Sequence, residues 1–97
     1  MCGIAGFVDM RGEPVMESGA TLSVMGRLLA HRGPDGSGEW SAPGDRAGLV
    51  HRRLAIIDLS PAGAQPMEAP NDTVVSLNGE IYNYLDLKEE LIQKNYK

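Results

Sequence analysis

The feature that most constrains the fold is the run of alternating residues directly behind the first methionine. In residues 2–9, CGIAGFVD, one set of positions holds Gly3, Ala5 and Phe7 and the other holds Ile4, Gly6 and Val8. A period of two that includes β-branched and aromatic side chains is typical of a β-strand. The following residues 10–14, MRGEP, carry the glycine and proline that end such an element. We therefore predict a strand over residues 2–9, which places Cys2, the only cysteine of the chain, almost at the N-terminus.

Two helices are predicted from apolar residues at helical spacing. The first covers residues 18–33, with Ser18 as its N-cap and Gly33-Pro34 as its stop. Its expected core face is formed by Leu22, Met25, Leu28 and Leu29. The second covers residues 84–94, with Leu87, Leu91 and Ile92 on one face and Glu90 and Lys94 as an i,i+4 ion pair. Both patterns indicate amphipathic helices that pack on a sheet.

Three further strands are expected between the helices. Residues 38–43 and 47–58 flank a turn at Pro43-Gly44-Asp45, and residues 73–79 follow a loop over residues 59–72. Short strands joined by turns favour antiparallel pairing. The predicted class is therefore α+β, mainly antiparallel sheet with two helices, in one small domain.

Composition excludes several classes of function. No apolar run approaches the ~20 residues of a membrane span, and the first residues lack the pattern of a signal peptide. The net charge is −4 and the basic residues are scattered, which argues against nucleic-acid binding. We expect a cytoplasmic protein with no membrane or nucleic-acid partner. Neither histidine is expected to act as a neutral catalytic base, because His31 and His51 each precede an arginine. No metal site is predicted, because no Cys, His or carboxylate cluster has ligand spacing.

The position of Cys2 leaves two interpretations open. A lone cysteine is commonly a small buried hydrophobic residue. Removal of Met1, however, would leave Cys2 with a free α-amine beside its own thiol, and that amine is an available base at neutral pH. The same residue would then hold both the nucleophile and its base. Position alone does not decide between these interpretations.

Four stretches together favour the nucleophile interpretation: MCGIAGF at residues 1–7, HRGPD at 31–35, HRRLAIIDLSPAGAQPM at 51–67 and NGEIYNY at 78–84. The set resembles the class II glutamine amidotransferase domain, a member of the N-terminal-nucleophile hydrolases, and most of all the branch found in glutamine-hydrolysing asparagine synthetases. The resemblance extends from Met1 to about residue 92. It implies that residues 1–97 are a partial amidotransferase domain, namely the N-terminal half of a four-layer αββα fold.

The resemblance also implies roles for individual residues. Cys2 would attack the side-chain carboxamide of glutamine, and Asn78 and Gly79 would form the oxyanion hole. Arg53 would bind the α-carboxylate of glutamine through its planar fork. Further glutamine contacts are implied for Ile56, Ile57 and Glu80. Taken without the family, Asn78-Gly79 is a turn signal and an arginine is a solvated side chain; we keep the latter interpretation for Arg52, which a strand would place on the opposite face from Arg53.

The HRGPD loop would border the pocket, and Arg32 could pair with Asp35 to fix it. The family's later Ser-Asp segment, which holds the glutamine α-amino group, has no counterpart in these 97 residues, and neither has the synthetase domain. No cofactor is therefore expected in this chain, while ATP and Mg²⁺ would belong to the synthetase domain of a parent protein. The expected partners are glutamine, that synthetase domain and a second copy of the chain, because a sheet covered on one face invites association.

The leading hypothesis is thus the glutamine amidohydrolase half-reaction, which releases ammonia for an ATP-dependent amidation. An alternative from another class is a truncated, non-catalytic module acting in assembly or regulation. A third is a thiol enzyme acting on another amide, against which the presence of Arg53 argues.

Overall fold

The computed structural model describes residues 2–56 and 60–96. Its elements are β1 (Gly3–Val8), α1 (Ser18–Leu28), β2 (Gly36–Ser41), β3 (Ala47–Arg53), β4 (Met67–Glu68), β5 (Val74–Val75) and α2 (Tyr84–Gln93). All strand pairs formed by the described residues are antiparallel. The predicted α+β class with two helices is confirmed. Neither helix in the described part of the chain is long and apolar enough to cross a membrane.

The main sheet has three strands in the order β1-β3-β2. The predicted strand over residues 2–9 is confirmed as β1, and the turn at residues 43–45 is a short 3₁₀ turn between β2 and β3. The strand expected over 47–58 ends at Arg53, so the prediction is wrong for residues 54–56, and its last two positions, 57 and 58, lie outside the described residues. There the backbone bonds to side chains instead of a neighbouring strand, with Leu54 N–H donating to Cys2 and Ala55 N–H donating to Asp35.

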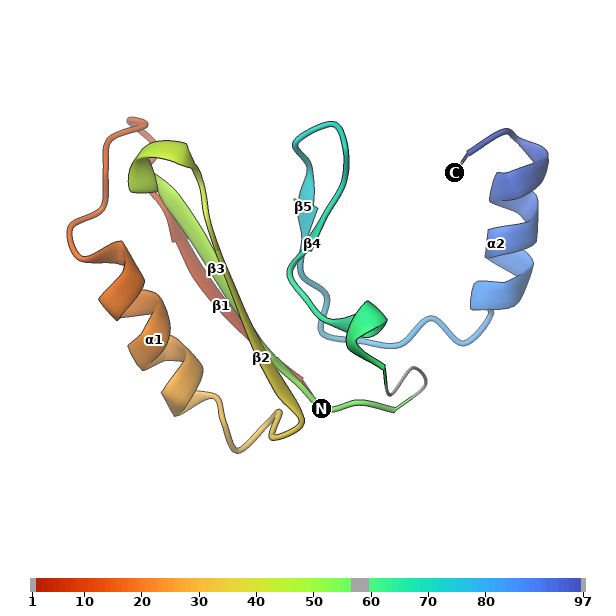
Figure 1. Cartoon of the computed structure of the whole chain (residues 1–97), viewed down its shortest axis with the longest axis horizontal. Helices are drawn as coiled ribbons and strands as arrows, with labels where there is room; N and C mark the ends of the chain where they lie inside the picture. Colours follow the sequence, from red (N-terminus) through yellow and green to blue (C-terminus); the bar gives the residue numbers. More distant parts are fainter. Residues whose placement is uncertain (1, 57–59, 97) are drawn as a thin grey trace.

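Helix α1 covers one face of this sheet (Figure 1). Leu22 and Val50 are buried, and Val50 Cγ2 lies 3.2 Å from the position that a Cβ on Gly26 would take. A helix residue without a side chain thus lets α1 approach β3 closely. Three details of the prediction are wrong. Leu28 is 70% exposed rather than core, because it faces away from the sheet. The N-cap is Glu17, with no capping side chain, rather than Ser18. The helix ends at Leu28 rather than at residue 33, because the N–H groups of Ala30 and Arg32 bond to carbonyls three residues back, in tight turns.

The opposite face of the sheet is open along much of its length. Ile4, Val8, Trp40 and Leu49 line a hollow of about 730 Å³ there, whose other wall is β5. Strands β4 and β5 form a separate two-stranded hairpin beside the sheet (Figure 1). The strand predicted over residues 73–79 is wrong beyond Val75, because the described residues offer no strand for 76–79 to pair with.

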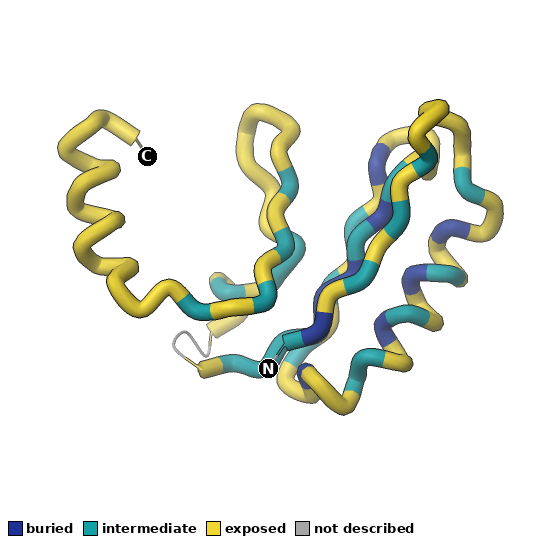
Figure 2. Tube along the Cα trace, turned by 180° about the vertical axis from the view of Figure 1, so that it is seen from behind, coloured by how far each residue is buried: buried dark blue, intermediate teal, exposed yellow. Residues whose placement is uncertain are grey.

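Helix α2 stands apart from the rest of the chain (Figure 1). Its predicted extent and the pair between Glu90 and Lys94, at 2.8 Å, are confirmed. None of its residues is buried, and the apolar face with Leu87 and Leu91 is exposed. Figure 2 shows the contrast: the buried positions gather on α1, the three-stranded sheet and its connections, while α2 is exposed throughout.

Candidate active site

Cys2 lies directly before β1 and is half-buried. Its sulfur touches the backbone of Leu54 twice: the Leu54 N–H donates to Sγ at 3.3 Å, and the thiol faces the Leu54 carbonyl at 3.7 Å. Antiparallel pairing of Gly3 with Arg52 brings these two chain segments together. The sheet therefore fixes the thiol at the point where the chain leaves β3.

The HRGPD loop touches both sides of this point. Arg32 Nε donates to the Cys2 carbonyl at 3.2 Å, and Asp35 Oδ2 accepts the Ala55 N–H at 2.9 Å. The expected pairing of Arg32 with Asp35 is therefore wrong, because each side chain satisfies a backbone group of another segment. The loop ties the start of β1 to the chain that follows β3.

The two arginines of β3 project to opposite faces, as predicted. Arg52 Nε donates to the Gly33 carbonyl at 3.0 Å on the side of α1. Arg52 is half-buried there, so the expectation of a solvated side chain is wrong. Arg53 projects to the other face, where its Nη1 donates to the Ser60 carbonyl at 2.6 Å and its guanidinium lies against Gly63. The guanidinium is thereby held over the open face of the sheet.

Two small cavities adjoin at the thiol. One, of about 150 Å³, is lined in part by Arg53, Leu54 and Gln65. The other, of about 230 Å³, is lined in part by Asn78 and Tyr82. The residues that line both cavities are Cys2, Ile56, Gly79 and Glu80. The structure thus brings six of the seven residues singled out from the sequence to one place; the seventh, Ile57, lies outside the described residues.

This arrangement holds complementary chemical groups. A guanidinium carries five N–H donors in a planar fork, so a bond through Nη1 does not exhaust the capacity of Arg53. Asn78 adds a side-chain amide and Gly79 a backbone N–H that no Cβ shields. Glu80 supplies the negative charge. Within residues 2–56 and 60–96, no group of three or more His, Cys, Asp or Glu side chains could hold a metal ion.

Sequence reasoning missed several residues that line the cavities. Leu54 takes part through its backbone, which leaves no signal in the side-chain pattern. Gln65 lies inside the stretch SPAGAQPM, so that stretch could have drawn attention to it. Tyr82 lies inside NGEIYNY and lines the second cavity.

Comparison with known proteins shows the family of the chain. A family model described as glutamine amidotransferase domain matches residues 1–97. The chain is 43% identical to asparagine synthetase B (glutamine-hydrolyzing) of Escherichia coli strain K12 over 91 residues, which are 93% of the chain and 16% of that protein. It is 40% identical to asparagine synthetase (glutamine-hydrolyzing) 3 of Bacillus subtilis strain 168, over 100% of the chain and 16% of that protein. It is also 40% identical to amidase chry2 of Gibberella zeae, over 94% of the chain and 15% of that protein.

No solved structure matches the chain. The curated relatives are much longer, and the chain spans between 15 and 20% of their length. The family itself is clear, since the model covers every residue. The chain belongs to the class II glutamine amidotransferase domain family, and its relatives include glutamine-hydrolysing asparagine synthetases.

Proposed function

We propose that the chain carries the glutamine-hydrolysing half-reaction of an asparagine-synthetase-type enzyme, with Cys2 as the nucleophile. The observation that carries this proposal is the convergence at two adjoining cavities of the only thiol, the Arg53 guanidinium and the Asn78-Gly79 pair. Hydrolysis of the side-chain amide of a free amino acid requires three kinds of group: a nucleophile, a binder for the α-carboxylate and hydrogen-bond donors for the oxyanion.

The chemistry follows from these groups. The Cys2 sulfur bonds to the side-chain carbonyl carbon of glutamine, and the carbonyl π electrons move to oxygen, where Asn78 and Gly79 donate hydrogen bonds. Collapse of this tetrahedral intermediate breaks the C–N bond and releases ammonia, whose third proton comes from the thiol by way of the Cys2 α-amine. Water then cleaves the glutamyl thioester, which releases glutamate and restores the thiol.

We propose that Arg53 selects the substrate. Arg53 and Cys2 line the same cavity, and the pairing of β1 with β3 sets the spacing between the two residues. A bidentate pair with a carboxylate favours a free amino acid over an amide within a peptide. Ile56, Ile57 and Glu80 complete the glutamine site in this proposal.

The rest of the amidation belongs, in this proposal, to residues outside the chain. The 97 residues would form the N-terminal half of a four-layer amidotransferase domain, and a synthetase domain would use ATP and Mg²⁺ to activate the acceptor. The names of the bacterial relatives favour aspartate as that acceptor. A further chain segment or a second copy would cover the open sheet face.

A Cys2→Ala variant tests the proposal in the parent protein. Glutamine hydrolysis and glutamine-dependent amidation should be lost, while amidation supplied with free ammonia should continue, because the thiol serves only the first half-reaction. Equal loss of both amidation activities would overturn the proposal. Ser23→Ala, on the exposed side of α1, is the matched control and should retain both activities.

A second candidate function, a non-catalytic module, is favoured by one observation: α2 buries none of its residues. A module that acts through docking would keep such a face for its partner. In that case Cys2 would not react with glutamine-like electrophiles even when the chain is fully assembled.

A further inference from the structure

The residue before the Asn78-Gly79 pair is held in an unusual way. The chain leaves β5 at Val75 and forms no strand over residues 76–80, so no ladder of backbone bonds supports it. Leu77 nevertheless has both of its backbone groups bonded, and in both bonds the partner is a side chain from another segment. Because Leu77 directly precedes Asn78, the conformation of the Leu77 backbone sets the direction in which the chain enters Asn78.

One bond comes from β3. His51 Nε2 lies 3.2 Å from the Leu77 carbonyl oxygen. A carbonyl only accepts, so this ring nitrogen carries the proton and donates. The His51 side chain is 1% exposed and cannot exchange this partner for water without opening the site.

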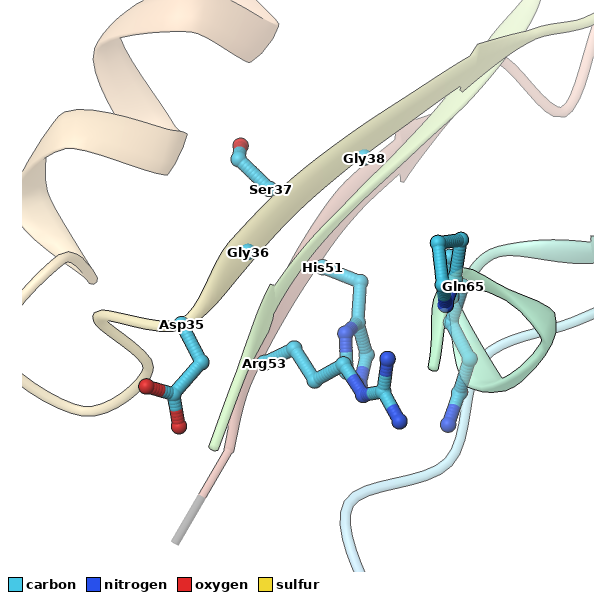
Figure 3. Close-up of a pocket in the computed structure, with 9 residues that line it drawn as sticks. Asp35, Gly36, Ser37, Gly38, His51, Arg53 and Gln65 are labelled. Atoms are coloured by element: carbon cyan, nitrogen blue, oxygen red, sulfur yellow. The ribbon is translucent and has the colours of Figure 1, made fainter. Parts of the chain in front are cut away.

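The second bond comes from the loop before β4. Gln65 Oε1 accepts the Leu77 N–H at 2.6 Å. Gln65 lies directly against the sheet. Its backbone approaches Gly38 of β2 so closely that a Cβ on Gly38 would collide with the Gln65 carbonyl oxygen. Figure 3 shows His51 and Arg53 projecting from β3 toward the segment that carries Gln65.

Peptide planarity gives these two bonds their effect. The Leu77 N–H belongs to the peptide plane before Leu77, and the Leu77 carbonyl belongs to the plane after it. Fixing both planes fixes the two backbone torsions of Leu77. The Asn78 N–H lies in the second plane and points opposite to the Leu77 carbonyl, so Asn78 begins from a set orientation.

The surroundings of His51 show what its ring does. It lines a cavity of about 250 Å³ together with Arg53, Gln65 and Gly38. Its Nδ1 is buried, and among the described residues no hydrogen-bond partner for it is found. A buried polar ring is costly unless it makes a needed bond, and a leucine would fill the same space without that cost. The bond to Leu77 is the contact that accounts for a histidine here.

We propose that His51 and Gln65 are positioning residues: together they clamp the backbone of Leu77 and so aim the Asn78-Gly79 donors at the cavity that contains Cys2. The role in catalysis rests on the proposed function, whereas the clamp itself does not. Neither side chain touches the thiol in this assignment, and both act through the Leu77 backbone.

A matched pair of variants tests the clamp. His51→Gln places an amide N–H the same number of bonds from the backbone as Nε2, whereas His51→Leu keeps the volume and removes the donor. ¹⁵N relaxation of the 97-residue chain should give order parameters of about 0.8 or above at Leu77, Asn78 and Gly79 in the wild type and in His51→Gln. In His51→Leu they should fall to about 0.6 or below. The amides of α1 should be unchanged in all three proteins.

Unchanged order parameters at Asn78 and Gly79 in His51→Leu would overturn the clamp, as would an equal loss in His51→Gln. If His51→Leu does not fold, Gln65→Met and Gln65→Glu form a second pair, because glutamate keeps the accepting oxygen and methionine does not. Mobility should then rise at Leu77 only in Gln65→Met. Equal mobility in both would contradict the proposal.

A kinetic measurement tests the positioning role. In the reaction of Cys2 with 6-diazo-5-oxo-norleucine, His51→Leu should lower the maximal inactivation rate about tenfold, the usual effect of one lost hydrogen bond, and leave the half-saturating concentration within about twofold. A change in the half-saturating concentration alone would assign His51 to substrate binding and overturn this role. If the wild-type chain takes no adduct at all, the proposed function of this chain fails, while the relaxation data still decide the clamp.

Discussion

Helices α1 and α2 are similar in length, and both have an apolar face, yet α1 is packed against the sheet and α2 is exposed to solvent. Helix α1 buries Ser18, Leu22 and Gly26 against the sheet, whereas α2 buries nothing. The difference lies in the available packing surface. Helix α1 packs on β1, β2 and β3, whereas the described residues place no sheet face beside α2. An amphipathic pattern therefore predicts a helix, and a packed helix only where a partner surface exists.

The same contrast between packed and exposed parts divides the described chain into two regions. The packed region holds α1 and the three-stranded sheet, and the open region holds residues 60–96, with β4, β5 and α2. The buried hydrophobic residues of the described chain are Leu22, Ala42 and Val50, and all belong to the α1 and sheet region. The radius of gyration is 15.0 Å, compared with about 13 Å for a compact domain of 100 residues. The candidate site lies between the two regions, with Cys2 and Arg53 on the packed side and Asn78 and Gly79 on the open side.

The largest expected effect is on the packed core. Leu22→Ala should lower the free energy of unfolding by about 2 to 4 kcal/mol, because Leu22 is 1% exposed and its loss leaves a cavity. The comparison variant Leu91→Ala, in α2, should change it by less than about 1 kcal/mol, since Leu91 is already 48% exposed. Urea denaturation followed by circular dichroism measures both. Similar losses would show that α2 is packed in solution and that the contrast is wrong.

A second variant acts on the junction of the two regions. Gly38→Ala would drive a Cβ into the Gln65 carbonyl oxygen and should destabilise by about 1 to 3 kcal/mol, with the 60–79 segment displaced from the sheet. Gly19→Ala, in α1, meets no neighbour and should stabilise by roughly 0.5 to 1 kcal/mol because alanine favours helix. Opposite signs from the same chemical change would localise the effect to the junction. Two stabilising variants would place Gln65 away from β2.

A third variant acts on binding across the junction. Arg53→Lys should weaken binding of glutamine about tenfold, because a point charge replaces a planar fork. Arg52→Lys should leave that affinity within about twofold, since Arg52 reaches Gly33 on the other face of the sheet. Competition by glutamine against a thiol-directed glutamine analogue measures both affinities. Equal weakening would remove the distinction between the two arginines.

The smallest expected effect lies at the edge of the packed region, where β1 ends. Hydrogen bonds from the Arg11 side chain and backbone lower the pKa of Asp9 below its usual 3.8. A lowered folded-state pKa adds stability above pH 3.8 that is lost as the pH falls through the folded value. Asp9→Asn should therefore be slightly less stable than the wild type at pH 7. The difference should shrink as the pH falls toward the folded-state pKa of Asp9, and thermal melting from pH 7 down to pH 3 measures it. The effect is small because the Arg11 side chain is 76% exposed, so that solvent screens the ion pair.

The sequence supplied those parts of the fold that depend on local periodicity. It predicted β1, both helices and antiparallel pairing, since each is written into the spacing of apolar residues. It failed at residues 54–56 and 76–79, where an extended segment becomes a strand only if another strand lies beside it. It also extended the first helix over residues 29–33, where the chain turns instead. The opposite directions of Arg52 and Arg53 followed from the period of two in β3.

The candidate site was predicted less completely. Motif resemblance singled out the residues that surround Cys2, but the bonds of His51 and Gln65 to Leu77 join segments far apart in the chain. No local pattern records such a contact. The sequence therefore predicts no role for His51, although His51 begins one of the four family stretches.

The most direct test of the account is the intact mass of the 97-residue chain before and after incubation with 6-diazo-5-oxo-norleucine. We expect loss of Met1 and one adduct, located at Cys2 by peptide mapping, with glutamine in excess preventing the reaction and Arg53→Lys slowing it. This result would show that the thiol, the guanidinium and the Asn78-Gly79 pair form one glutamine pocket. Loss of Met1 with no adduct at Cys2, under conditions in which a simple alkylating agent still reaches the thiol, would contradict the central claim for this chain.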